Sequence, residues 1–155
     1  MGSIPITRKG YEAMKKELAN LKAVERPQTI KAIAEARALG DLSENAEYHA
    51  ARERQSFLEG RINELSGKLA NANVIDPDAS ARDKAVFGCT VLLENMDTGD
   101  EVTYQLVGPD ESDINQGLIS VTSPLGQAIL GKSPGANITL QAPGGVRKYE
   151  LVEIL

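Results

Sequence analysis

The feature that most constrains the fold is a run of residues spaced alternately three and four positions apart along the first half of the chain. This spacing keeps every member on one stripe of a continuous helix and is typical of a coiled-coil seam. We therefore predict a helix from Ser43 to about Val74, roughly 48 Å long at about 1.5 Å per residue. The stripe consists of Tyr48, Ala51, Gln55, Leu58, Ile62, Leu65, Leu69 and Ala72.

A partner helix with the same spacing precedes this stripe. Pro27 interrupts its phase, because proline removes a backbone donor and crowds the preceding turn. We expect a kink there, after which the pattern resumes at Ile30 and Ile33. The first part of this second stripe consists of Tyr11, Met14, Leu18 and Leu21.

The connection between the two helices is the short segment around Gly40. Glycine accepts the positive φ of a helix C-terminal position at little cost, and Asp41 or Ser43 can cap the helix that follows. We expect residues 1–76 to form an antiparallel coiled-coil domain with an acidic tip at residues 40–44.

The second half of the chain has the pattern of strands separated by turns. Two hairpins are predicted, with turns at residues 97–100 and 143–145. Between them we predict a short strand, then a short helix with Ser123 as N-cap, Pro124 at its first position and Gly131 at its end. The expected fold class is α+β, with the long helical hairpin followed by a small antiparallel β-sheet domain carrying a short helix.

Charge is divided unevenly along the chain. Residues 1–78 hold 12 basic and 12 acidic side chains, whereas residues 79–155 hold 5 basic and 10 acidic ones. The net charge of -5 gives no overall cationic field, so general affinity for duplex DNA is not expected and any nucleic-acid contact must be local. The polar segment 77–84 is rich in turn formers and is predicted to be a linker to a domain over residues 85–155.

A single cysteine, Cys89, has no partner for a disulfide within the chain and suits a reducing cytoplasm. The sequence contains no apolar stretch of signal-peptide or membrane-span length. We therefore expect a cytoplasmic protein that does not contact membranes.

Asp41 and Glu44 are the candidate chemical groups, and two interpretations of them remain open. They can form a capping box, with Glu44 bonding back and both charges favoured by the helix dipole. Alternatively they are half of a magnesium site, because Mg²⁺ requires octahedral oxygen geometry and usually completes its shell with water and substrate phosphates. The missing half would come from a nucleic-acid enzyme whose active centre the tip can enter.

Several motifs together resemble one family over nearly the whole chain. From about Ile4 to the C-terminus the sequence is similar to the bacterial transcript cleavage factors of the GreA type. The motifs are IPITRKGYEAMKKEL, ERPQTIKAIAEAR, GDLSENAEYHAA, EGRINEL, VIDP, DTGDE, ISVTSPLGQAILGK and PGG.

The resemblance implies a factor that is not itself an enzyme. Its coiled coil would enter the secondary channel of RNA polymerase, while a C-terminal domain of FKBP-like fold would dock at the rim of the channel. Asp41 and Glu44 match the family's tip pair, which helps to hold the polymerase's second Mg²⁺ and to position the attacking water in a backtracked complex. The polymerase then cuts the extruded RNA 3′ end. The free protein would hold no cofactor and would be a monomer.

Two further residue pairs are candidates for contacts. Arg37 and Arg52 lie within about two turns of the tip and resemble the family's basic patch, which contacts RNA phosphates. The alternative is a solvated helix face, with Arg52 in weak ion pairs with Glu47, Glu53 or Glu59. Separately, the resemblance places Ser123 and Pro124 in the loop that contacts the polymerase rim, although the pattern also fits a plain helix start.

Other classes of function are less favoured by the residues. A prolyl isomerase needs an aromatic-lined pocket, and past residue 80 the aromatic residues are Phe87, Tyr104 and Tyr149. His49 has no partner for general-base chemistry and is expected on the helix surface. A secondary-channel inhibitor without cleavage activity remains the main alternative, and a dimerising coiled-coil protein is the structural one.

Overall fold

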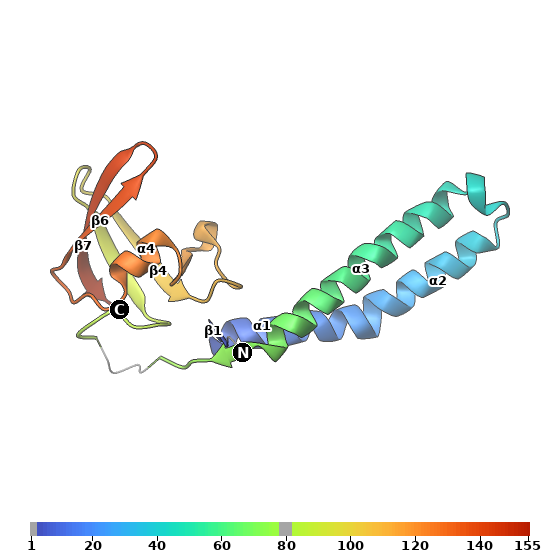
Figure 1. The fold of residues 1–155 in the computed structure, drawn as a ribbon, viewed down its shortest axis with the longest axis horizontal. Helices are drawn as coiled ribbons and strands as arrows, with labels where there is room; N and C mark the ends of the chain where they lie inside the picture. Colours follow the sequence, from blue (N-terminus) through green and yellow to red (C-terminus); the bar gives the residue numbers. More distant parts are fainter. Residues whose placement is uncertain (1–2, 78–81) are drawn as a thin grey trace. The chain divides into compact units, whose positions relative to one another are not determined.

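The computed structural model describes residues 3–77 and 82–155 (Figure 1). It forms two compact units, one over Tyr11–Asn71 and one that joins the described residues up to Gly10 with those from Ala72 onward. The middle of the predicted linker, residues 78–81, lies outside the described residues. The domain boundaries inferred from the sequence stay a prediction.

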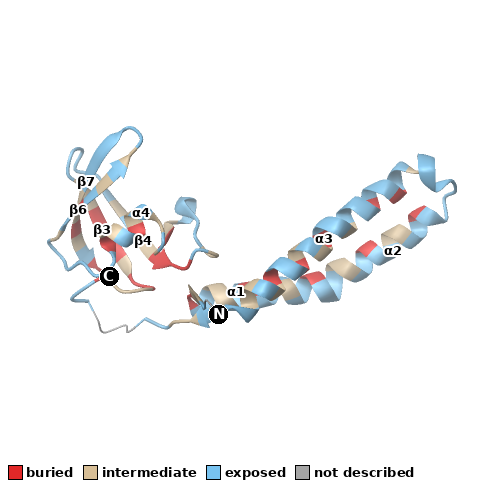
Figure 2. Cartoon of the chain, in the orientation of Figure 1, coloured by how far each residue is buried: buried red, intermediate tan, exposed pale blue. Residues whose placement is uncertain are grey.

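The first unit is an antiparallel helical hairpin. Its outgoing arm consists of α1 (Arg8–Asn20), a π-helical turn η1 (Leu21–Glu25) and α2 (Arg26–Arg37), and its return arm is α3 (Ala46–Ala70). Figure 2 shows the buried residues of α2 and α3 on the sides that face each other. The predicted seam is confirmed along α3, where the buried side chains are Tyr48, Ala51, Leu58, Ile62 and Leu65.

The outgoing arm changes phase at η1. A π-helical turn holds one residue more than an α-helical turn, so the residues after it are rotated about the helix axis. Thr29 is therefore the residue that faces the seam, with 1% of its surface exposed, and its hydroxyl donates to the Glu25 carbonyl. The prediction that Ile30 rejoins the seam is wrong, because Ile30 is 53% exposed.

The return helix is shorter than predicted at both ends. It begins at Ala46 after a short 3₁₀ turn, η2 (Leu42–Glu44), and its 25 residues span roughly 38 Å. At the far end the chain leaves the helix for a strand, β2 (Ala72–Val74), which pairs in parallel with β1 (Ile4–Ile6). This pairing joins segments far apart in the sequence. The pattern of apolar residues within either segment alone could not predict it.

The second unit contains a five-stranded sheet in the order β5-β4-β3-β7-β6. Both predicted hairpins are confirmed, and so is the short helix α4 (Pro124–Ile129) with Ser123 as its N-cap. The sheet is not wholly antiparallel, because β4 and β5 pair in parallel after a crossover through the short 3₁₀ helix η3 (Ile114–Gln116). The strands are β3 (Thr90–Asn95), β4 (Glu101–Val107), β5 (Leu118–Ser120), β6 (Asn137–Ala142) and β7 (Gly145–Ile154).

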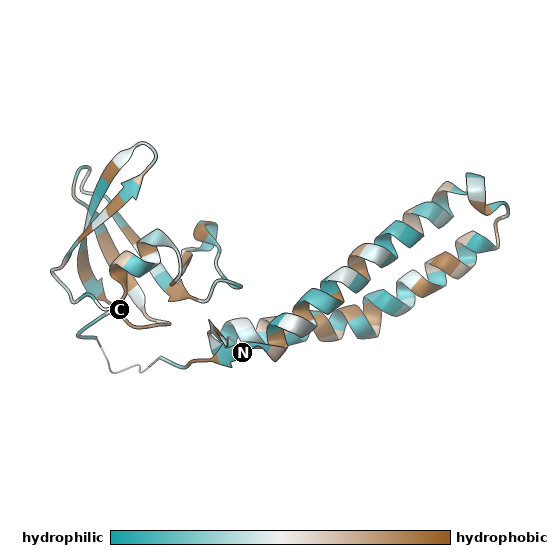
Figure 3. Cartoon of the chain, in the orientation of Figure 1, coloured by the Kyte–Doolittle hydropathy of each residue, from teal (hydrophilic) through white to brown (hydrophobic). Residues whose placement is uncertain are grey.

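Apolar side chains of the five-stranded sheet and of α4 meet in one core. The hydropathy colouring shows them along the strands of the sheet (Figure 3). The most deeply buried are Val91, Leu93, Leu106, Ile129, Ile138 and Leu151. The predicted α+β class, a helical hairpin followed by a small sheet domain with one short helix, is confirmed. Among the described residues, no helix combines the length and apolar character that crossing a membrane would require.

Candidate functional site

The tip of the hairpin is built by a tight backbone path between α2 and α3. Gly40 adopts a φ of +129°, as its predicted place after the helix end requires. Asp41 then begins η2, and its Oδ1 accepts hydrogen bonds of 2.9 Å from both the amide and the hydroxyl of Ser43. Both bonds lower the pKa of the Asp41 carboxyl, and the one from the Ser43 amide has the larger effect. The side chain therefore carries its charge at neutral pH.

The capping box, one of the two interpretations of Asp41 and Glu44, is not formed. Asp41 caps the short η2 turn instead of α3, and among the described residues the structure gives Glu44 no hydrogen-bond partner. Both carboxylates are exposed. Together with Glu47 they line a groove of about 430 Å³ at the tip, whose remaining walls come from Leu39, Asn45 and Ala46.

The true cap of α3 is Asn45, a residue that the sequence analysis did not single out. Its Oδ1 accepts from the Tyr48 amide at 3.0 Å, and its Nδ2 donates to the Ala36 carbonyl at 2.5 Å. One side chain therefore closes the start of α3 and ties it to the end of α2. The signal was available, because asparagine before an apolar-periodic run is a strong N-cap candidate.

Below the tip, the structure brings Arg37 and Arg52 together around one aromatic ring. Each guanidinium carbon lies 5.8 Å from the centroid of the Tyr48 ring, a distance within the range of cation–π attraction. Arg52 Nη1 also donates to the Tyr48 hydroxyl at 2.9 Å. Hydrogen bonding from Arg37, and then from Arg52, lowers the pKa of the Tyr48 phenol.

The ion pairs considered for Arg52 are not those the structure has. Glu59 instead forms a two-pronged pair with Arg26 across the hairpin, with N–O distances of 2.9 and 2.7 Å. His49 is exposed, and its ring makes an edge contact with the Tyr48 ring at 5.6 Å between centroids. It lies on the helix surface, as expected.

The tip offers a hard cation only part of a coordination shell. No group of three or more histidine, cysteine or acidic side chains that could hold a metal ion occurs within residues 3–77 and 82–155. Asp41 and Glu44 nevertheless supply carboxylate oxygens, the ligand type that Mg²⁺ prefers. The donor set therefore fits Mg²⁺ as a contribution to a shell completed by other molecules.

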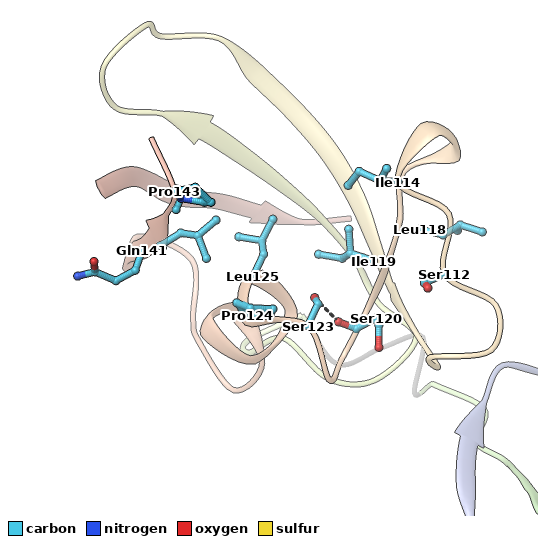
Figure 4. Close-up of a pocket in the computed structure, with 12 residues that line it drawn as sticks. Ser112, Ile114, Leu118, Ile119, Ser120, Ser123, Pro124, Leu125, Gln141 and Pro143 are labelled. Carbon is cyan, nitrogen blue, oxygen red and sulfur yellow. Dashed lines mark hydrogen bonds between the residues drawn. The ribbon is translucent and has the colours of Figure 1, made fainter. Parts of the chain in front are cut away.

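Ser123 and Pro124 lie at a separate, largely apolar cavity of about 500 Å³ in the second unit. In Figure 4 the side chains of Ile119 and Leu125 project into it from β5 and α4, and Pro143 borders it from the β6–β7 turn. The Ser123 hydroxyl donates to the Ser120 carbonyl at 2.6 Å and accepts from the Gly126 amide at 3.1 Å. Pro124 is exposed beside it.

Comparisons with known proteins cover both units. The family model for the N-terminal part of the transcription elongation factors GreA and GreB matches residues 4–74, and the model for their C-terminal part matches residues 79–155. The transcription elongation factor GreA of Alkalilimnicola ehrlichii is 60% identical over 155 residues, covering 99% of this chain and 98% of that protein. GreA of Neisseria meningitidis serogroup A is 56% identical over 155 residues, with the same coverage.

Solved structures are more distant. GreA factor homolog 1 (Gfh1) of Thermus thermophilus is 27% identical over 99% of each chain, with a TM-score of 0.43. The GreA/GreB factor of Nitrosomonas europaea is 24% identical over 98% of each chain, with a TM-score of 0.44. The sequence matches over both the helical hairpin and the sheet domain define a transcription elongation factor. The chain belongs to the GreA/GreB family of these factors.

Proposed function

We propose that the protein inserts its helical hairpin into the secondary channel of RNA polymerase and stimulates cleavage of backtracked RNA 3′ ends by the polymerase's own active site. The observation that carries this proposal is the pair of exposed carboxylates, Asp41 and Glu44, at the very tip of the hairpin. No packing requirement within the hairpin explains their position. The proposed result is the rescue of arrested transcription complexes.

The chain's own contribution to the chemistry is to place two carboxylate groups in the polymerase's active centre. Asp41 is held in one orientation by Ser43 and remains ionised, so it can offer an oxygen ligand without first losing a proton. Glu44, which has no partner among the described residues, can turn toward the same ion or toward an attacking water. A shared Mg²⁺ would supply the activation of that water for attack on the phosphodiester.

The remaining candidate residues have supporting roles in this proposal. Arg37 and Arg52 would contact phosphates of the extruded RNA as it passes the tip. Ser123 and Pro124 would contact the polymerase rim at the apolar cavity beside α4. Because α2 and α3 bury the seam against each other, the hairpin needs no second copy, which supports a monomer. The proposed place of action is the cytoplasm, where the polymerase works.

The test is RNA cleavage in stalled, backtracked polymerase complexes. The wild-type protein should accelerate shortening of the RNA, whereas Asp41→Ala and Glu44→Gln should abolish the acceleration and still bind polymerase. Glu47→Gln is the matched control, because it removes a carboxylate from the same groove and should retain activity. Binding without acceleration by the wild type would favour the inhibitor function, and cleavage of naked RNA by the isolated chain would contradict the proposal.

A further inference from the structure

Tyr48 lies between two cationic side chains contributed by the two arms of the hairpin. Arg37 ends α2 and Arg52 is in the second turn of α3, yet both guanidinium groups lie over the same ring at equal centroid distances of 5.8 Å. Tyr48 as a residue is only 8% exposed. Tyr48 therefore has almost no surface with which to stack on a base, and any effect on a ligand must act through its neighbours.

Arg37 and Arg52 differ in their partners from Arg26 and Arg61, two further arginines of the hairpin. Arg26 is neutralised by Glu59, and Arg61 by Glu17, through short two-pronged ion pairs. Within the described residues neither Arg37 nor Arg52 forms an ion pair with a carboxylate. An uncharged ring holds them instead, and it leaves their positive charge available to an incoming anion.

The geometry also leaves donors available. Arg52 uses Nη1 to donate to the Tyr48 hydroxyl, and the other N–H groups of its guanidinium are not consumed by this bond. Guanidinium groups match phosphate oxygens in pairs of parallel hydrogen bonds, and stacking on an aromatic face fixes the plane in which those bonds lie. An orientation fixed before binding lowers the entropy lost when the phosphate arrives.

The backbone beneath the cluster is fixed by Asn45. Its side chain accepts from the Tyr48 amide and donates to the carbonyl of Ala36, the residue before Arg37. The two arms are thus tied together at the level of the ring, so the spacing between the two arginines is set by both a side-chain stack and a backbone bridge.

From these contacts we infer that Tyr48 is a positioning residue, which holds Arg37 and Arg52 as one preorganised phosphate-binding pair spanning both arms of the hairpin. The inference deepens the proposed function, on which it rests for the identity of the ligand, an RNA phosphate near the extruded 3′ end. In this inference the buried Tyr48 phenol controls the affinity for backtracked complexes. Asp41 and Glu44 have a different role, which is to provide ligands for the shared Mg²⁺.

The experiment compares the affinity of the factor for two polymerase complexes, one backtracked with an extruded RNA 3′ segment and one not backtracked. Tyr48→Phe keeps the ring and removes only the hydroxyl. We expect it to reduce the preference for the backtracked complex about three- to tenfold, the range that corresponds to the net contribution of an ordinary hydrogen bond. The cleavage rate at saturating factor should change little, because the tip carboxylates are untouched.

Coupling between the residues separates positioning from a general structural role. Arg52→Ala should reduce the preference at least as much as Tyr48→Phe, and the double variant should lose less than the sum of the two single losses, because part of the Tyr48→Phe effect acts through Arg52. Tyr11→Phe is the matched control, because Tyr11 also carries a cation over its ring, Lys15 at 5.6 Å, but lies in α1. It should behave as the wild type, and all variants should melt within a few degrees of it.

Two outcomes would overturn the inference. One is a Tyr48→Phe variant with unchanged preference for backtracked complexes, and the other is full additivity with Arg52→Ala. Failure of the proposed function looks different, because the wild type would then bind but not accelerate cleavage. The affinity comparison does not depend on cleavage and still reports on Tyr48 in that case.

Discussion

The side-chain nitrogen Nδ2 of Asn45 lies 2.5 Å from the carbonyl oxygen of Ala36 and so bridges the two arms of the hairpin one turn below its tip. The same side chain caps α3 by accepting from the Tyr48 amide. The tip carboxylates are therefore carried on a turn whose two ends are joined directly. This bridge explains how an exposed turn can present Asp41 and Glu44 in a defined position.

Replacing Asn45 should loosen this turn. Asn45→Ala removes both the cap and the bridge and should destabilise the hairpin by about 1–2 kcal/mol, measured by urea unfolding followed by circular dichroism. Asn45→Asp keeps the cap acceptor and loses only the interhelix donor, so it should fall between alanine and wild type. Equal stability of Asn45→Ala and wild type would contradict the assigned role.

The phase change at η1 can be tested by comparing a buried seam residue with a residue that η1 turns toward solvent. Leu65 is 1% exposed, so Leu65→Ala should cost about 2–5 kcal/mol through lost burial and a cavity. Ile30→Ala changes a residue that is 53% exposed and should cost less than about 1 kcal/mol, in the range usual for surface positions. A large loss for Ile30→Ala would instead support the sequence-based prediction that the seam resumes at Ile30. Both values are measurable by urea unfolding.

Stability of the hairpin should depend on pH through Glu59. Its hydrogen bonds with Arg26, and then the charge of Arg26, hold the pKa of the Glu59 carboxyl below its ordinary value of about 4.3. The stabilisation is thus fully present above that ordinary value and is lost as pH falls through the lower value in the folded state. Glu59→Gln should lower Tm at pH 7, and the difference from wild type should vanish in acid. A difference that stayed constant down to pH 3 would exclude this pair as the cause.

Two glycines should respond to alanine in opposite directions. A Cβ on Gly108 would lie 1.9 Å from the Pro5 carbonyl oxygen, so Gly108→Ala must displace backbone and should destabilise the second unit by about 1–3 kcal/mol. Gly60 lies within α3, where a Cβ would meet open space, so Gly60→Ala should stabilise the hairpin by about 0.5–1 kcal/mol. Thermal unfolding monitored by circular dichroism checks both, and a neutral Gly108→Ala would contradict the close approach to Pro5.

The sequence predicted those parts of the fold that depend on local periodicity and turn chemistry. The three-and-four spacing through Leu58 and Leu65 indicated a helix with one buried stripe, and Gly40 marked its partner's end. Ser123 followed by Pro124 located the start of α4. These features depend on backbone preferences and on which face of one element is apolar, so each can be read within a single segment.

Contacts between distant segments required the tertiary structure. The π-helical turn places Thr29 in the seam instead of Ile30, because its extra residue rotates the rest of the arm about the helix axis. The parallel pairing of β1 with β2 joins residues nearly seventy positions apart, as in Ile4 opposite Ala72. Neither feature leaves a periodic signal in its own segment.

The candidate site divides in the same way. The sequence by itself determined that Asp41 and Glu44 stand at a helical turn and that Arg37 and Arg52 lie nearby, because helix geometry converts spacing into position. Only the tertiary structure decided that both arginines share the ring of Tyr48 and that Asn45 joins the arms beneath them. The physical reason is that these contacts cross between two helices, and their distances are set by how the seam packs.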